Sequence, residues 1–239
     1  MKDKPLSIEN RWDILYRDYP EIYDEFASVP YRPHKIDVIH EKLNLSRKIV
    51  VDIGSGSGRS TIQIARYAEQ VIGVEPEKSM RDQAVKNTAE LGIDNVGYVD
   101  GRAEEIPLDE GVADMVVALT AVMHPPEEVV PLFIEEARRV VKPGGTIVSV
   151  DVAPGWYGGE LADFIDDPDA DVELTSKHRI FVDEAGFSYF DIEQTSYYGS
   201  LEKIVGTYGF IFGERVIDYI RRNNLTSIKW TFRVYYDDN

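Results

Sequence analysis

The sequence has no cysteine among its 239 residues. This absence excludes disulfides, cysteine metal sites and thiol nucleophiles together. Long apolar runs are missing as well: none reaches the roughly 18 residues that a membrane-spanning helix needs, and the first residues lack the apolar core of a signal peptide. We therefore expect a cytoplasmic protein with no membrane partner, and we expect no metal centre.

Positive charge is also scarce, because 26 Lys and Arg residues stand against 43 Asp and Glu residues and the net charge is −17. Proteins that bind nucleic acid through its phosphates usually carry basic patches, so we expect no nucleic-acid partner. An acidic surface favours solubility. The chain is long enough for one α/β domain with a full core.

From residue 48 to residue 151, apolar runs of strand length alternate with helical patterns. This alternation predicts strands at 48–53, 71–75, 96–99, 114–119 and 146–151, and helices at 59–69, 77–90 and 127–141. Such an alternation is typical of a doubly wound, mostly parallel α/β sheet. The ligands of these sheets bind beyond the carboxyl ends of the strands.

The two ends of the chain differ from this middle part. Residues 1–46 have helical and aromatic character and are broken by Pro20, Pro30 and Pro33. The C-terminal part predicts a loop at 152–171, a helix at 174–185, a strand at 187–197, a helix at 201–222 and a strand at 228–235. We expect one domain overall, with an N-terminal helical lid segment at 1–46, a main domain at 47–239 and a helical cap at 200–224 inserted between the last two strands.

The most informative segment is Ile49–Ser60, where an apolar strand ends in Asp52 and glycines follow at alternate positions (Gly54, Gly56 and Gly58). Glycine lets the backbone turn sharply and come close to a ligand. The helix that follows offers unpaired N–H groups to an anion. The nicotinamide fingerprint needs a glycine where Arg59 stands, so that cofactor is disfavoured. The Gly-Lys-Ser/Thr sequence of a phosphate-binding P-loop is absent as well.

Segments of the chain, taken in order, resemble the motifs of the class I S-adenosylmethionine-dependent methyltransferase family. These segments are Val51–Gly58, Val71–Pro76, Asp100–Pro107, Ala113–Leu119 and Glu136–Gly145. The resemblance implies a Rossmann-like, mostly parallel seven-stranded sheet. It also implies a methyltransferase with S-adenosylmethionine as cofactor and S-adenosylhomocysteine as product.

The resemblance further implies which residues hold the cofactor. The glycine loop suits its methionine end, Asp52 suits its ammonium group, and the Glu75 carboxylate can accept both ribose hydroxyls. The residues expected to bind the cofactor are Asp52, Gly54, Ser55, Gly56, Gly58, Glu75, Pro76, Met80, Gly101, Arg102, Ala103, Glu104, Leu119 and Thr120. Arg102 departs from the commonest family pattern, because many relatives have an acid there and an arginine accepts no hydrogen bond. Backbone groups of Arg102 and Ala103, or the nearby Glu104, would then recognise the adenine.

The methyl acceptor is expected beyond the strand that ends at Leu119. His124 is a candidate catalytic base or orienting group there, and the alternative is a residue that starts a helix. The residues expected to contact the acceptor are Tyr16, Tyr19, Tyr23, His124, Trp156, Tyr157, Tyr208 and Phe212. Aromatic residues at helical spacing also suit ordinary core packing, which is the alternative for this set.

The function that the sequence favours is methyl transfer to a small-molecule acceptor by in-line displacement. The protein must place a nucleophile at about 3–3.5 Å from the methyl group and keep bulk water out. A general base is needed only when the nucleophile is protonated at working pH. Two alternatives stay open: a catalytically silent S-adenosylmethionine-binding module, and a protein methyltransferase.

Overall fold

The computed structural model describes residues 5–121, 127–165 and 167–238. The chain forms two compact units. Unit 1 contains residues 1–34, 153–172 and 193–232, and unit 2 contains residues 35–152, 173–192 and 233–239.

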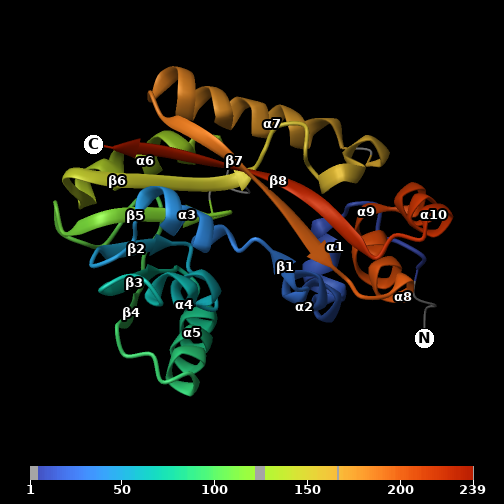
Figure 1. The fold of residues 1–239 in the computed structure, drawn as a ribbon, viewed down its shortest axis with the longest axis horizontal. Coiled ribbons are helices and arrows are strands. Elements are labelled where there is room, and N and C mark those ends of the chain that lie inside the picture. Colours follow the sequence, from blue (N-terminus) through green and yellow to red (C-terminus); the bar gives the residue numbers. More distant parts are fainter. Residues whose placement is uncertain (1–4, 122–126, 166, 239) are drawn as a thin grey trace. The chain divides into compact units, whose positions relative to one another are not determined.

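Unit 2 is built on parallel strands (Figure 1), and the central strand of this part is buried on both faces. The parallel strands are β2 (Ile49–Ile53), β3 (Gln70–Val74), β4 (Val96–Val99), β5 (Ala113–Leu119) and β6 (Val141–Val152), and neighbours pair in the order β6-β5-β2-β3-β4. Val50 and Val51 point to opposite faces of β2, yet both are fully buried. Burial of both faces is expected of a parallel sheet that helices cover on each side. The predicted alternation of strands and helices is confirmed.

The helices of this part are α3 (Lys35–Leu43), α4 (Arg59–Ala65), α5 (Lys78–Glu90) and α6 (Val129–Val140). α6 shows why its sequence folds as a helix: its buried residues are Val130, Phe133, Ile134, Ala137 and Val140. They recur every three or four positions and form one apolar stripe in the core of unit 2. α4 ends at Ala65 rather than at residue 69, and the other two predicted helices are confirmed to within two residues.

Among the described residues, the sheet has eight strands in the order β1-β7-β8-β6-β5-β2-β3-β4. β7 (Ser188–Tyr197) and β8 (Ser227–Asp238) are the last two predicted strands, and each belongs partly to both units. The α/β class and the mostly parallel sheet are confirmed, whereas the expected number of seven strands was wrong. The additional strand, β1 (Tyr31–Arg32), pairs antiparallel with β7 and is only 2 residues long. So short a strand carries no alternation that a sequence pattern could reveal.

Unit 1 contains several short helices. They are α1 (Trp12–Asp18), α2 (Pro20–Ser28), the 3₁₀ helix η1 (Gly159–Phe164), α8 (Leu201–Ile204), the π-helical turn η3 (Val205–Gly209), α9 (Phe210–Phe212) and α10 (Glu214–Asn223). The single helix expected at 201–222 is interrupted at Gly213, whose φ of +120° is one that side-chain-bearing residues rarely adopt. The helical segment between β7 and β8 is therefore present, but in pieces.

The loop expected at 152–171 is only partly a loop. It contains η1, and α7 (Pro168–Arg179) begins within it rather than near residue 174. Proline fits the first turn of a helix. Asp169 and Asp171 are favourable there because their negative charge lies near the positive end of the helix dipole. α7 continues as the π-helical turn η2 (Ile180–Glu184), which ends before Gly186 as predicted.

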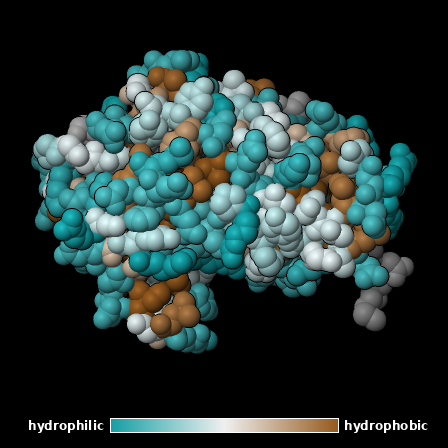
Figure 2. All heavy atoms as spheres, in the orientation of Figure 1, coloured by the Kyte–Doolittle hydropathy of each residue, from teal (hydrophilic) through white to brown (hydrophobic). Residues whose placement is uncertain are grey.

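The face of the molecule drawn in Figure 2 is mostly hydrophilic. Among the few large apolar side chains that are exposed, Met80 and Val85 lie on α5. No helix in the described part of the chain is both long and apolar enough to span a bilayer.

Candidate functional site

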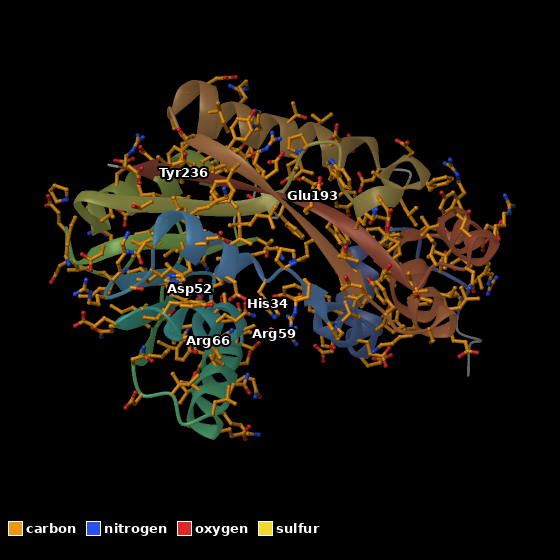
Figure 3. All side chains as sticks on the ribbon, in the orientation of Figure 1. His34, Asp52, Arg59, Arg66, Glu193 and Tyr236 are labelled. Carbon is orange, nitrogen blue, oxygen red and sulfur yellow. The ribbon has the colours of Figure 1, made fainter. Side chains whose placement is uncertain are left out.

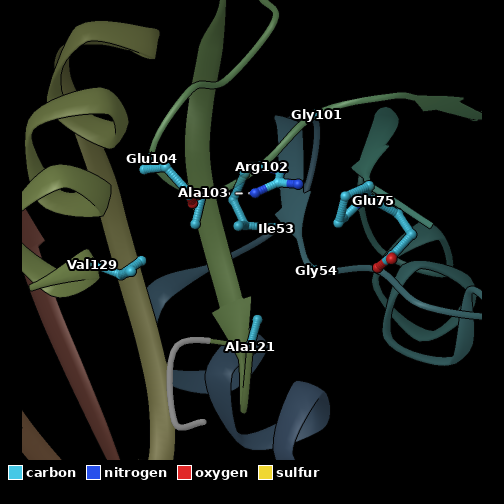
Figure 4. Close-up of a pocket in the computed structure, with 10 residues that line it drawn as sticks. Ile53, Gly54, Glu75, Gly101, Arg102, Ala103, Glu104, Ala121 and Val129 are labelled. Atoms are coloured by element: carbon cyan, nitrogen blue, oxygen red, sulfur yellow. Dashed lines mark ion pairs between the residues drawn. The ribbon is translucent and has the colours of Figure 1, made fainter. Parts of the chain in front are cut away.

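A pocket of about 440 Å³ lies in unit 2, beyond the carboxyl ends of β2, β3 and β4 (Figure 4). Its volume falls in the range of small-molecule sites. The residues that line it are Ile53, Gly54, Glu75, Pro76, Gly101, Arg102, Ala103, Glu104, Ala121 and Val129. The pocket thus brings together, from the loops after β2, β3 and β4, seven of the fourteen residues that the sequence motifs singled out for the cofactor.

The glycine loop after β2 has a backbone that only glycine adopts readily. Gly54 has a φ of +65° and Gly58 a φ of +85°. A Cβ atom on Gly58 would lie 2.5 Å from the hydroxyl oxygen of Tyr98, and one on Gly54 would lie 2.5 Å from the Cβ of Ala121. The N–H of Gly54 donates to the carbonyl of Val74 over 2.9 Å, which ties the loop to the end of β3. Both glycines are therefore required by conformation and by space.

Glu75 follows β3 and is held in place by backbone donors. It is 8% exposed, and its carboxylate accepts the N–H of Gly56 on Oε2 over 2.9 Å and the N–H of Glu77 on Oε1 over 3.0 Å. The Arg81 guanidinium donates to the carbonyls of Glu75 and Pro76 over 2.6 and 2.7 Å. Each carboxylate oxygen can accept more than one hydrogen bond, so Glu75 keeps acceptor capacity toward the pocket.

Asp52, which β2 carries (Figure 3), is fully buried. Its Oδ2 accepts hydrogen bonds from the hydroxyls of Ser60 (2.7 Å) and Thr61 (2.6 Å), whereas its Oδ1 has no partner. Burial raises the pKa of Asp52 to about 6; the two hydroxyls oppose the rise, and the charge of Glu75 adds to it. The nearby Ser55 hydroxyl is buried without a partner too. Two polar atoms beside the glycine loop are thus left for a ligand to satisfy.

The loop after β4 forms the opposite side of the pocket. The Arg102 side chain is 69% exposed and lies 3.8 Å from the Glu104 carboxylate, as Figure 4 shows. The N–H and carbonyl of Arg102 pair with the carbonyl and N–H of Glu105, over 3.4 and 3.3 Å. Because the Arg102 backbone is engaged in its own loop, the Glu104 carboxylate is the better acceptor at this wall of the pocket.

Sequence reasoning missed three apolar residues that line the pocket: Ile53, Ala121 and Val129. The position of Ile53 in the strand could have found it, since it is the last residue of β2 and ligands of such sheets bind at that end. No pattern marks Ala121 or Val129, which reach the pocket only through the fold.

Seven residues expected to bind the cofactor lie outside the pocket lining: Asp52, Ser55, Gly56, Gly58, Met80, Leu119 and Thr120. Met80 is 46% exposed on α5, so it belongs neither to the lining nor to the core. Leu119 ends β5, and Thr120 follows with a φ of +54°, which is rare for a residue with a branched side chain. The N–H of Thr120 donates to the carbonyl of Val150 over 2.7 Å. Backbone strain of this kind persists where surrounding contacts impose it, often at functional sites.

The residues expected to contact the acceptor are not placed at the pocket. His124 lies outside the described residues, as does the side chain of Tyr16. The remaining members all belong to unit 1: Tyr19, Tyr23, Trp156, Tyr157, Tyr208 and Phe212. Their role in acceptor binding stays a prediction. Among the described residues, no group of His, Asp and Glu side chains is arranged to hold a metal ion.

Within unit 1 several of these aromatic residues pack together. Tyr208 and Phe212 are buried with ring centres 4.6 Å apart, and the Tyr208 hydroxyl donates to the carbonyl of Gly158. The Tyr157 hydroxyl accepts the indole N–H of Trp12 over 2.7 Å. These contacts are those expected of the packing alternative.

Comparison with known proteins agrees with the site. Residues 50–145 match a family model described as a methyltransferase domain. The chain is 30% identical over 129 residues to the uncharacterized methyltransferase YcgJ of Bacillus subtilis, which covers 51% of this chain and 50% of YcgJ. It is 27% identical over 157 residues to the demethylmenaquinone methyltransferase of Oceanobacillus iheyensis, covering 63% of this chain and 65% of the relative.

A solved structure has the same fold. The crystal structure of a SAM-dependent methyltransferase from Aquifex aeolicus superposes with a TM-score of 0.56 at 17% identity, covering 86% of this chain and 90% of that one. The chain spans about half of the length of the first curated relatives that it matches. The family match and the motifs cover the same part of the chain, because both begin within β2, at residues 50 and 51, and both finish at Gly145 within β6.

Proposed function

We propose that this chain, whose residues 50–145 match a methyltransferase domain, is a class I S-adenosylmethionine-dependent methyltransferase that transfers the cofactor's methyl group to a small-molecule acceptor. The observation that carries the proposal is the pocket beyond the carboxyl ends of β2, β3 and β4, where the glycine loop and Glu75 meet. Ligands of open α/β sheets bind at this edge.

The amino-acid end of the cofactor fits the glycine loop. Gly54 and Gly58 bring the backbone close to a ligand, and the unpaired Oδ1 of Asp52 would accept from the cofactor's ammonium group, directly or through water. The buried Ser55 hydroxyl offers a further polar contact. A ligand that supplies a cationic donor here would satisfy atoms that the protein alone leaves unpaired.

The nucleoside end fits the other side of the pocket. The fixed Glu75 carboxylate would accept hydrogen bonds from the two ribose hydroxyls. Glu104 would accept a hydrogen bond from the adenine amino group, a role that falls in many relatives to an acid at the position of Arg102. The apolar side chains of Ile53 and Val129 would pack against the flat base.

The bound cofactor supplies an electrophilic methyl group on a sulfonium centre, so the chain has to hold an acceptor in line with the methyl–sulfur bond and exclude water. A small organic acceptor is supported by the apolar lining residues and by the similarity to an enzyme whose name states demethylmenaquinone as its acceptor. An orienting contact of His124 with the acceptor, a lid at 1–46 and a specificity cap at 200–224 are further parts of this proposal.

Isothermal titration calorimetry with S-adenosylmethionine and S-adenosylhomocysteine tests the proposal. The variant Glu75→Gln removes the charge-assisted acceptor, which contributes about 1.5–3 kcal/mol, so the Kd of both compounds should rise roughly 10- to 150-fold. Glu77→Gln is the matched control, since it makes the same chemical change at an exposed position two residues away. The Kd of this control should stay within about twofold of the wild-type value.

The result decides between the alternatives as well. Absence of binding to the wild type, or equal affinities of the Glu75→Gln and Glu77→Gln proteins, would contradict the assignment of this pocket as the cofactor site. Binding without production of S-adenosylhomocysteine across small-molecule acceptors would favour a silent binding module. Turnover with protein acceptors alone would favour a protein methyltransferase.

A further inference from the structure

Asp151, near the carboxyl end of β6, is a buried carboxylate without hydrogen-bond donors. It is 2% exposed, and neither Oδ1 nor Oδ2 has a partner. Ser149, two residues earlier on the same strand, is fully buried and its hydroxyl has no partner either. Buried polar groups are nearly always hydrogen-bonded, so two unpaired side chains in succession on one strand call for an explanation.

The register of the sheet places these two side chains on the face that forms the pocket. Ile53 of β2 pairs with Ala118 of β5, and Ala118 pairs with Ser149 of β6. Laterally paired residues in a parallel sheet point to the same face, and residues i and i+2 on a strand do so as well. Ser149 and Asp151 therefore share the face from which Ile53 reaches the pocket. With neighbouring strands about 4.8 Å apart, Ser149 lies about 10 Å from Ile53, and Asp151 lies farther toward the ligand-binding edge.

The strand between them leads to the same place. β5 ends at Leu119, which pairs with Val150, and the strained Thr120 donates its N–H to the carbonyl of Val150. Asp151 thus follows Val150, the residue of β6 whose carbonyl holds the loop after β5. It stands beside the cofactor pocket rather than inside it, where a second ligand would have to lie.

Titratable groups from two other elements face Asp151. α7 contributes Lys177, which is 1% exposed and donates to the Glu173 carboxylate over 2.6 Å, and β8 contributes Tyr235. Burial raises the pKa of Asp151 to about 7; the Lys177 ammonium opposes the rise, and Glu173 adds to it. Near neutral pH this carboxyl can therefore exist with or without a proton.

A purely structural role does not account for this arrangement. A buried carboxyl without donors costs free energy that an apolar residue of similar size would avoid. Carboxyl groups with raised pKa values at the ligand-binding edge of a fold are candidates for proton transfer or substrate recognition.

We propose that Asp151, together with Ser149, binds the proton-bearing oxygen or nitrogen of the methyl acceptor and takes up its proton. The acceptor is then an alcohol, phenol or amine rather than a carbon nucleophile without an acidic proton. As the acceptor's heteroatom forms its bond to the methyl carbon, the carbon–sulfur bond breaks, its electron pair stays on sulfur, and the proton passes to the Asp151 carboxylate. This inference rests on the proposed function, because it needs the cofactor pocket to be occupied.

The test uses pairs of probes in which methyl groups replace the O–H or N–H hydrogens: 4-methylphenol with 4-methylanisole, benzyl alcohol with benzyl methyl ether, and aniline with N,N-dimethylaniline. Ligand-observed NMR measures their binding to the protein saturated with S-adenosylhomocysteine. In the wild type, at least one protic probe should bind at least about tenfold more tightly than its methylated counterpart. Asp151→Asn should reduce this preference several-fold, because the neutral amide oxygen is a weaker acceptor than the carboxylate. Asp114→Asn is the matched control, because Asp114 lies on the neighbouring β5 near its amino end.

Each outcome bears on the inference. A preference that is undiminished in Asp151→Asn, or that Asp114→Asn reduces equally, would overturn it. Failure of every protic probe to bind the wild-type complex would overturn the proposed acceptor class. Calorimetry of S-adenosylhomocysteine on the same samples separates these results from failure of the proposed function: Asp151→Asn should leave that Kd unchanged, and absence of this binding in the wild type would refute the cofactor site itself.

Discussion

Replacing Asp151 by Asn should change how the stability of the protein depends on pH. Burial raises the pKa of Asp151 from 3.8 to about 7 in the folded state. In the unfolded chain the carboxyl ionises near its ordinary pKa, so rising pH favours the unfolded state between these two values. The free-energy cost of ionising the buried carboxyl is absent below the lower pKa. It increases with pH between the two pKa values and is complete above about pH 7. Three pKa units correspond to about 4 kcal/mol.

About half of this penalty should develop between roughly pH 5.5 and pH 8. Urea denaturation at intervals across that range gives the unfolding free energy of both proteins. The wild type should lose about 2 kcal/mol relative to Asp151→Asn as the pH rises. Taking the difference between the two proteins cancels the contribution of Asp52, whose pKa is also raised.

Asp114→Asn is the control of opposite sign. Burial would raise the pKa of Asp114, but the Lys142 ammonium and the Ile49 N–H outweigh it and the pKa is lowered. Asp114 therefore stabilises the fold above its ordinary pKa, and this contribution is lost only as the pH falls through the lowered value. The difference between wild type and Asp114→Asn should stay constant across the measured range. Parallel pH profiles for wild type and Asp151→Asn would refute the assignment of Asp151 as a buried, donor-poor carboxyl.

Two further predictions concern the glycine loop. Gly58→Ala should destabilise the fold by about 1–3 kcal/mol, seen as a lower Tm, because its Cβ would meet the Tyr98 hydroxyl at 2.5 Å in a positive-φ backbone. Gly56→Ala should cost less, since no atom lies within 4 Å of the corresponding Cβ, and equal costs would count against the steric argument. The affinity for S-adenosylmethionine should rise with pH through about 6 as Asp52 ionises, whereas calorimetry of Asp52→Asn should show no such rise. If the wild-type affinity for S-adenosylmethionine did not change from about pH 5 to pH 8, Asp52 would not be a partner of its ammonium group.

The fold of unit 2 could be predicted because local patterns and long-range contacts agree there. Val50 and Val51 are apolar on both faces of a central strand, and the α6 residues recur at helical spacing. Where the pattern depended on a single residue, the prediction was incomplete. Gly213 interrupts an apolar stripe that reads as one helix, and Pro168 starts a helix inside a stretch that reads as a loop.

The candidate site was predictable where backbone conformation restricts the choice of residue. Gly54 and Gly58 must be glycine, and Glu75 follows a recognisable strand, so each leaves a trace in the sequence. Ala121 reaches the pocket only because β5 lies beside β2, and no spacing in the sequence encodes this contact. Asp151 escaped notice for a similar reason: its lack of donors depends on what surrounds it in three dimensions.

A crystal structure with S-adenosylhomocysteine tests the central claim most directly. We expect electron density for the compound in the pocket of unit 2. Its ribose hydroxyls should donate hydrogen bonds to the Glu75 carboxylate, and its amino-acid end should contact the loop that contains Gly54 and Gly58. Density at another place, or an empty pocket in crystals grown with saturating compound, would contradict this claim.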